Sequence, residues 1–156
     1  MKCRLIAAGT RLPDWVNAGF REYQKRLRAP LVLELEEISI VACRAGENPQ
    51  PAMAREGERM LAALGHKDHV VALEISGSSM STGELSVWLN AKLRQAKPIA
   101  LLIGGPNGLA HACLERAVER WSLSPLTLPH ALVRILVAEQ LYRAMSFAAG
   151  HPYHRA

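Results

Sequence analysis

The chain has 156 residues, is 49% apolar and carries a formal net charge of +5. This length predicts a single domain, residues 1–156, with enough apolar surface for a core that needs no disulfide or metal to hold it. No apolar run approaches the roughly 18 residues that span a bilayer, so a membrane protein is excluded, while the basic balance weakly favours phosphate-bearing partners.

Strand and helix patterns alternate along the chain. Short apolar or alternating segments predict strands at residues 2–9, 31–38, 69–75, 98–104 and 122–128. Helical spacing and start signals predict helices at residues 13–27, 51–65, 81–96, 109–121 and 130–148. Ser81 and Glu84 form a capping-box pattern at the start of the third helix. The repeated order predicts an α/β fold with a mostly parallel sheet and helices on both faces.

The helix predicted at 130–148 is apolar almost all round, so it should be buried on more than one side. A partner subunit would supply that burial, and so would a deep seat within the fold. Glu139 and Arg143 stand four residues apart in the favourable order, which predicts an ion pair. Arg134 lies on an otherwise apolar surface, where it either pairs with an acid or faces a phosphate.

The cysteines Cys3, Cys43 and Cys113 are scattered and odd in number, without a C-x-x-C or a zinc-ligand spacing. We expect reduced thiols that pack as small apolar groups. Reduced thiols fit a cytoplasmic protein, and the sequence predicts no metal site.

A glycine loop follows the most apolar predicted strand, in LLIGGPNG at 101–108. Ligands of parallel α/β sheets bind beyond the carboxyl ends of the strands, and glycines let the backbone approach them. Gly104 and Gly105 are therefore candidates for contacting a nucleotide-like ligand, although a plain tight turn has the same pattern. The loop lacks G-x-G-x-x-G and Gly-Lys-Ser/Thr, which counts against NAD and ATP.

Ser124, Pro125 and Thr127 interrupt the apolar segment SLSPLTLPH at 122–130. Small polar side chains and a proline fix an extended backbone whose N–H and C=O groups can recognise an adenine edge. An edge strand that tolerates proline is the alternative. His130 follows at the start of the last helix, on the same face as Arg134.

The closing segment, HPYHRA at 151–156, gathers groups suited to RNA around a proline. Arginine supplies phosphate contacts, histidine can move protons near neutral pH, and tyrosine can stack on a base. No acid follows Glu139, so this end of the chain is basic. A frayed basic terminus would have the same composition.

Three segments together, LLIGGPNG, SLSPLTLPHALVRILVAEQLYRA (122–144) and HPYHRA, resemble the ribosomal RNA large-subunit methyltransferase H family. This family belongs to the SPOUT class of knotted methyltransferases. The N-terminal LIAAGTRLPDWVNAGFREYQKRL is similar to the same family, so the resemblance spans essentially the whole chain. The turn after Ile75 departs from it, with Ser78 where members commonly carry Lys.

The resemblance implies a C-terminal trefoil knot and a homodimer joined through the knotted region and the last helix. It implies methyl transfer from S-adenosylmethionine to N3 of a pseudouridine in 23S rRNA of the assembled ribosome. It places the cofactor on the following residues: Leu73, Gly104, Gly105, Leu123, Ser124, Pro125, Leu126, Thr127 and Leu128. It places the substrate and the catalytic groups on the following residues: His130, Arg134, Tyr153, His154 and Arg155.

An imide N3 holds its proton at neutral pH, so a proton must leave during or before methyl transfer. We expect His154, or else His130, to accept it. Arg155 would stabilise the developing charge, and Tyr153 would stack on the base. Three alternatives stay open: a SPOUT methyltransferase on another RNA such as tRNA, a non-catalytic ribosome-binding module, and an enzyme on a small molecule that needs no basic tail.

Overall fold

The computed structural model describes the backbone of residues 1–155 and the side chains of residues 1–153. Within this range five strands form one sheet, in the order β2-β1-β4-β3-β5, and every pair is parallel. The strands are β1 (Lys2–Ala8), β2 (Val32–Ile38), β3 (His69–Ser78), β4 (Ile99–Ile103) and β5 (Glu119–Trp121). The predicted parallel sheet is confirmed.

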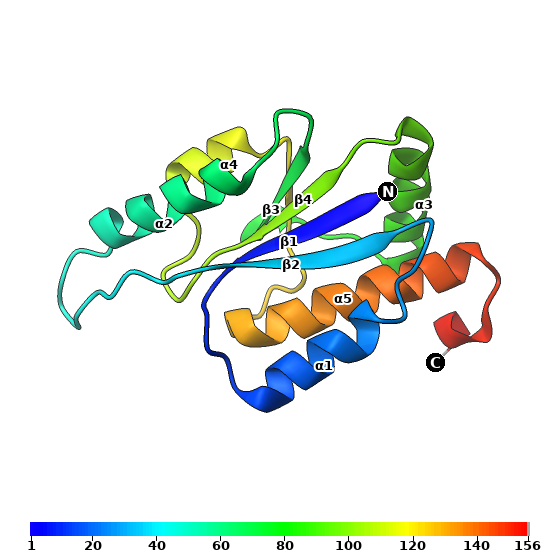
Figure 1. Cartoon of the computed structure of the whole chain (residues 1–156), viewed down its shortest axis with the longest axis horizontal. Helices are drawn as coiled ribbons and strands as arrows, with labels where there is room; N and C mark the ends of the chain where they lie inside the picture. The colour runs from blue at the N-terminus through cyan, green and yellow to red at the C-terminus, as the bar shows by residue number, and fades with distance from the viewer. Residues whose placement is uncertain (156) are drawn as a thin grey trace.

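Helices cover both faces of the sheet (Figure 1). They are α1 (Asp14–Gln24), α2 (Gln50–Ala63), α3 (Thr82–Gln95), α4 (His111–Arg116) and α5 (His130–Ala148), followed by the short 3-10 helix η1 (Pro152–Arg155). Helices α1, α3 and α5 pack on one face, and α2 and α4 pack on the other. The predicted capping box is present, because the Ser81 hydroxyl accepts the Glu84 N–H and the Glu84 carboxylate accepts the Ser81 N–H.

Two apolar layers follow from the alternation of side chains along the central strands. Leu5 of β1 faces the layer under α1, α3 and α5, whereas its neighbour Ile6 faces the layer under α2 and α4. Every residue of β4 is buried, as its continuous apolar run predicts for a central parallel strand.

The cysteines are free thiols. Cys3 and Cys113 are buried, as expected for small apolar groups, while Cys43 is partly exposed. Burial raises the pKa of the Cys3 thiol to about 12 and also raises the pKa of Cys113. Both buried thiols therefore stay protonated at neutral pH.

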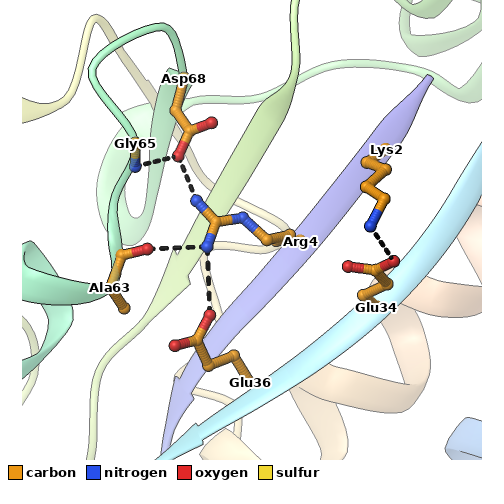
Figure 2. Close-up of polar contacts among 7 residues, drawn as sticks. All are labelled: Lys2, Arg4, Glu34, Glu36, Ala63, Gly65 and Asp68. Carbon is orange, nitrogen blue, oxygen red and sulfur yellow. Dashed lines mark hydrogen bonds and ion pairs between the residues drawn. The ribbon is translucent and has the colours of Figure 1, made fainter.

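Arg4 ties β1 to the connection between α2 and β3 (Figure 2). Its guanidinium donates to the Glu36 carboxylate at 3.2 Å, to the Ala63 carbonyl at 2.7 Å and to the Asp68 carboxylate. Asp68 also accepts the Gly65 N–H at 2.7 Å. The partly buried network fixes this connection toward the amino ends of the strands, away from the edge where ligands of such sheets bind.

The region from 109 to 128 differs from its prediction. The helix predicted at 109–121 ends after Arg116, and Glu119–Trp121 forms β5. The Val118 N–H donates to the Val70 carbonyl at 2.9 Å, and β5 continues that pairing along the open edge of β3. The strand predicted at 122–128 is an irregular loop, because its hydroxyl groups bond to the local backbone and Pro125 has no N–H to donate.

Helix α5 spans the residues predicted for it and lies between α1 and α3. The Ser86 hydroxyl of α3 donates to the Ala144 carbonyl at 2.8 Å, and the predicted Glu139–Arg143 ion pair is present at 2.6 Å. Leu132 and Leu136 nevertheless stay 37% and 40% exposed. The helix is thus deeply seated on one side and still presents apolar surface on another. Within the described residues, no helix combines the length and the apolar character needed to cross a membrane.

Candidate active site

A cavity of about 670 Å³ opens beyond the carboxyl ends of β3, β4 and β5. Its walls come from residues 73–75 of β3, from the glycine loop after β4, and from the last residue of β5 together with the loop that leads to α5. The volume lies within the range of about 300–1,000 Å³ that small-molecule sites occupy.

The glycine loop folds back on itself so closely that only glycine fits at one position. A Cβ at Gly104 would lie 2.4 Å from the carbonyl carbon of Gly108 and 2.7 Å from the nitrogen of Leu109. The Gly108 N–H donates to the Gly105 carbonyl at 3.0 Å, and Gly108 has a φ of +88°, which favours glycine. A Cβ at Gly105 would make only ordinary contacts. The glycines therefore allow the tight turn with which this loop lines the cavity.

The loop between β5 and α5 is held by its own serines. The Ser122 hydroxyl donates to the Ser124 carbonyl at 3.0 Å, and the Ser124 hydroxyl accepts the Leu126 N–H at 3.0 Å. Leu123 and Leu126 are exposed. This irregular backbone keeps peptide groups outside any sheet ladder, where they are available to a ligand.

The cavity gathers every residue predicted to contact the cofactor except Pro125. These residues are Leu73, Gly104, Gly105, Leu123, Ser124, Leu126, Thr127 and Leu128. Trp121 also lines the cavity, and the sequence analysis did not single it out. Its place directly before the polar loop is the signal that could have identified it. The structure brings these residues together, and their contact with a cofactor stays a prediction.

His130 lines the cavity at the first turn of α5. Its ring lies over the end of β1, where a Cβ at Gly9 would be 3.4 Å from the imidazole Nε2. Burial, and secondarily the charge of Arg134, lower the pKa of His130, while Glu56 opposes the shift. The imidazole is therefore neutral at neutral pH and can accept a proton.

Arg134 is buried, with 1% of its surface exposed. Its guanidinium donates to the Glu37 carboxylate at 2.7 Å and to the carbonyls of Ala8 and Gly9 at 3.0 and 2.6 Å. Of the two environments that the sequence allowed, the structure shows the ion pair. The direct substrate contact expected of Arg134 does not fit this burial; the side chain instead fixes the start of α5, and with it His130, to the ends of β1 and β2.

Tyr153 lies against the second half of α5. Its hydroxyl donates to the Glu139 carboxylate at 3.3 Å, its ring centroid is 4.7 Å from that of Tyr142, and the Arg143 guanidinium lies 4.9 Å from its centre. Glu139 and Tyr142 follow His130 by nine and twelve residues, so at about 1.5 Å per residue these contacts lie about 14–18 Å along the helix from His130. Figure 1 shows the tail beside the end of α5 remote from His130. Within one chain, Tyr153 thus does not line the cavity.

The side chains of His154 and Arg155 lie outside the described residues. Their catalytic roles stay predictions. Among the residues whose side chains are described, no group of three or more His, Cys, Asp or Glu is placed to hold a metal ion.

The fold and the cavity together define an α/β protein with a cavity of small-molecule size, lined by two loops at the carboxyl ends of its strands. A family model described as predicted SPOUT methyltransferase matches residues 1–154. The chain belongs to this family of methyltransferases. The fold family and the enzyme class expected from the sequence are confirmed.

Relatives named ribosomal RNA large subunit methyltransferase H match over their whole length. The one from Hahella chejuensis (strain KCTC 2396) is 49% identical over 155 residues, covering 99% of each chain. The one from Alkalilimnicola ehrlichii (strain ATCC BAA-1101 / DSM 17681 / MLHE-1) is 51% identical over 156 residues, covering 100% of each.

Solved structures of more distant methyltransferases share the fold. A probable methyltransferase from Bordetella pertussis Tohama I superposes with a TM-score of 0.56 at 18% identity, over 92% of this chain and 95% of that one. A probable methylase family protein from Haemophilus influenzae Rd KW20 gives 0.56 at 14% identity, over 96% of this chain and 69% of that one. At such identities the likeness concerns the fold alone.

Proposed function

We propose that this protein transfers a methyl group from S-adenosylmethionine to N3 of a pseudouridine in 23S rRNA of the assembled ribosome. The observation that carries the proposal is the cavity between two backbone turns, residues 104–108 and 122–129, in a methyltransferase chain. Its full-length relatives bear the name of a large-subunit rRNA methyltransferase, which supports this choice of substrate.

The residues around the cavity fit this methyl donor. Because Gly104 has no Cβ, the loop can fold back tightly on itself, and in this conformation Gly104 and Gly105 line the cavity. The loop at 123–128 offers peptide groups to an adenine edge, and Leu73 offers apolar surface. When bound, such a donor supplies an electrophilic methyl group on a sulfonium sulfur.

The protein's own task is to position the nucleobase and to remove a proton. Holding the acceptor nitrogen in line with the methyl group can lower the barrier by roughly 7–11 kcal/mol. His154, or else His130, accepts the N3 proton, Arg155 stabilises the imide charge, and Tyr153 stacks on the base. The neutral imidazole of His130 at the cavity supports its place in this scheme.

A homodimer would reconcile the position of the tail with that of the cavity. Tyr153 contacts α5 about 14–18 Å along the helix from His130 and does not line the cavity of its own chain, so a second protomer can supply the tail. The exposed Leu132 and Leu136 on α5 offer apolar surface for such an interface. The trefoil knot and a cytoplasmic location belong to this same proposal.

Mixed dimers test the shared site. A subunit lacking residues 151–156 and a subunit carrying Gly104→Ala should each be inactive as homodimers. Coexpressed, they should recover about half of the activity per heterodimer, because one intact cavity meets one intact tail. Mixtures that stay inactive although heterodimers form would contradict the shared site.

The substrate is tested by transfer of labelled methyl groups to ribosomes, free large subunits, purified 23S rRNA and tRNA in parallel. We expect label in 23S rRNA of ribosomes, at a uridine-derived N3, and binding that weakens steeply with salt. Label in tRNA alone would establish a different RNA substrate. Failure of the wild-type protein to bind S-adenosylmethionine would end the proposal.

A further inference from the structure

One carboxylate beside the cavity receives hydrogen bonds from two tryptophans. Glu119 of β5 accepts the indole N–H of Trp121 at 3.2 Å and that of Trp88, on α3, at 3.0 Å. The His69 Nε2 lies 2.6 Å from the carboxylate and the Lys92 ammonium lies 3.4 Å from it. We call these five residues the Glu119 cluster.

Trp121 stands between two cavities. It lines the large cavity, and it also lines a smaller one of about 110 Å³ between α3, α5 and the sheet. Only 7% of its surface is exposed. Because Trp121 belongs to the linings of both spaces, a rotation of its indole would change how much room the large cavity offers.

The backbone of Trp121 is held in place by a register shift in the pairing of β3 with β5. Trp121 pairs with Leu73 and again with Ser78, and the following Ser122 N–H donates to the Ser78 carbonyl at 3.0 Å. A Cβ at Gly77 would lie 2.6 Å from the carbonyl carbon of Trp121, so only glycine allows this crossing. The main chain is thereby fixed, and what remains to be set is the rotation of the indole.

The Glu119 cluster sets that rotation. Trp88 packs edge-on against Trp121, with ring centroids 4.6 Å apart and planes at 79°. Burial by itself raises the pKa of Glu119, but the hydrogen bonds from Trp88, His69 and Trp121 outweigh it and lower the pKa overall. An ionised acceptor makes a stronger bond to an indole N–H than a neutral one does.

We propose that Glu119 is a positioning residue of the methyl-donor site, which holds the Trp121 indole as the wall of the large cavity. Glu119 does not itself line that cavity. The inference rests on the proposed function, in which the cavity takes S-adenosylmethionine. Loss of Glu119 should therefore weaken donor binding and leave the rate at saturating donor nearly unchanged.

The test uses Glu119→Gln, Trp121→Phe and the double variant, with Glu115→Gln on the exposed face of α4 as the matched control. S-adenosylmethionine affinity is measured by isothermal titration, and kcat and KM by methyl transfer to ribosomes. We expect about tenfold weaker donor affinity in Glu119→Gln, the size of one hydrogen bond to a charged group, with kcat within about twofold of wild type. Glu115→Gln should match wild type.

The double variant separates positioning through Trp121 from a general structural effect. If Glu119 acts through the indole, the double variant should bind the donor no more weakly than Trp121→Phe alone. Additive losses, or unchanged affinity in Glu119→Gln, would overturn the inference. The wild-type affinity separately tests the proposed function.

A ligand-free measurement checks the positioning itself. The indole N–H signal of Trp121 in a ¹⁵N–¹H spectrum should move in Glu119→Gln and stay in place in Glu115→Gln. Trp121→Phe assigns that signal, because it removes the N–H and keeps an aromatic ring. A Trp121 signal that stays in place in Glu119→Gln would overturn the inference whether or not the donor binds.

Discussion

Replacing Gly104 by alanine should force the glycine loop open and weaken the binding of the methyl donor in the cavity. The added Cβ would lie 2.4 Å from the carbonyl carbon of Gly108, whereas ordinary contact begins near 3.4 Å, so the loop must shift by about 1 Å. Both clashing groups are backbone, so no side-chain rotation relieves them. Overpacking of this kind costs roughly 1–3 kcal/mol, and each kcal/mol lowers Tm by about 2–4 °C in a domain of this size.

The functional loss should exceed the loss of stability. A misplacement of about 1 Å at a site that works by alignment can reduce the rate about a hundredfold. Donor affinity by isothermal titration and initial rates of methyl transfer should both fall in Gly104→Ala, while the circular dichroism spectrum keeps its shape.

Gly105→Ala is the matched control, one residue away in the same loop. Its Cβ would lie 3.5 Å from the Ala8 Cβ and from the Glu56 carboxylate, which is ordinary contact. We expect a near wild-type Tm in this variant, because its Cβ strains no backbone contact. Equal loss of Tm in both variants, or normal donor affinity in Gly104→Ala, would refute the steric reasoning.

Four further predictions concern α5 and the tail. Arg134→Met leaves two buried carbonyls without their donor, so urea denaturation should show about 1–3 kcal/mol lower stability, and an unchanged stability would contradict the structure. The pKa of His130 lies below its ordinary 6.5, so the unfolded chain takes up this proton more readily than the folded protein does. As the pH falls from about 6.5 through the lowered pKa, the wild type should therefore lose stability relative to His130→Gln. Parallel curves of stability against pH for the two proteins would contradict this. In Glu56→Gln the pKa of His130, followed by NMR, should fall further, since an attractive charge is removed. Deletion of residues 151–156 should lower Tm slightly, because the contacts of Tyr153 with Glu139 and Tyr142 are lost, and it should leave donor affinity unchanged. It should abolish methyl transfer to ribosomes, whereas an active truncated protein would remove the tail from the mechanism.

The elements predicted most closely are those encoded by neighbouring residues. The α5 bounds, 130–148, and the capping box of Ser81 with Glu84 both match the structure. The buried strand β4 and the glycine loop after it could also be predicted from the sequence, because strand burial and turn formation depend on consecutive residues. The loop at 122–128 was singled out as a ligand contact, which stays a prediction although the loop lines the cavity, and its assignment to a strand was wrong.

The sequence by itself therefore determined the parallel α/β order and the two loops that line the cavity, since hydrophobic period and turn residues act over a few positions. Only the tertiary structure decided that β5 forms at 119–121, because the open edge of β3 supplies hydrogen bonds that outweigh helical spacing. It also buried Arg134 against Glu37 and joined Glu119 to His69 across 50 positions of sequence. Finally it placed Tyr153 against Glu139 and Tyr142 of α5 and outside the cavity of its own chain, a placement that no local pattern records.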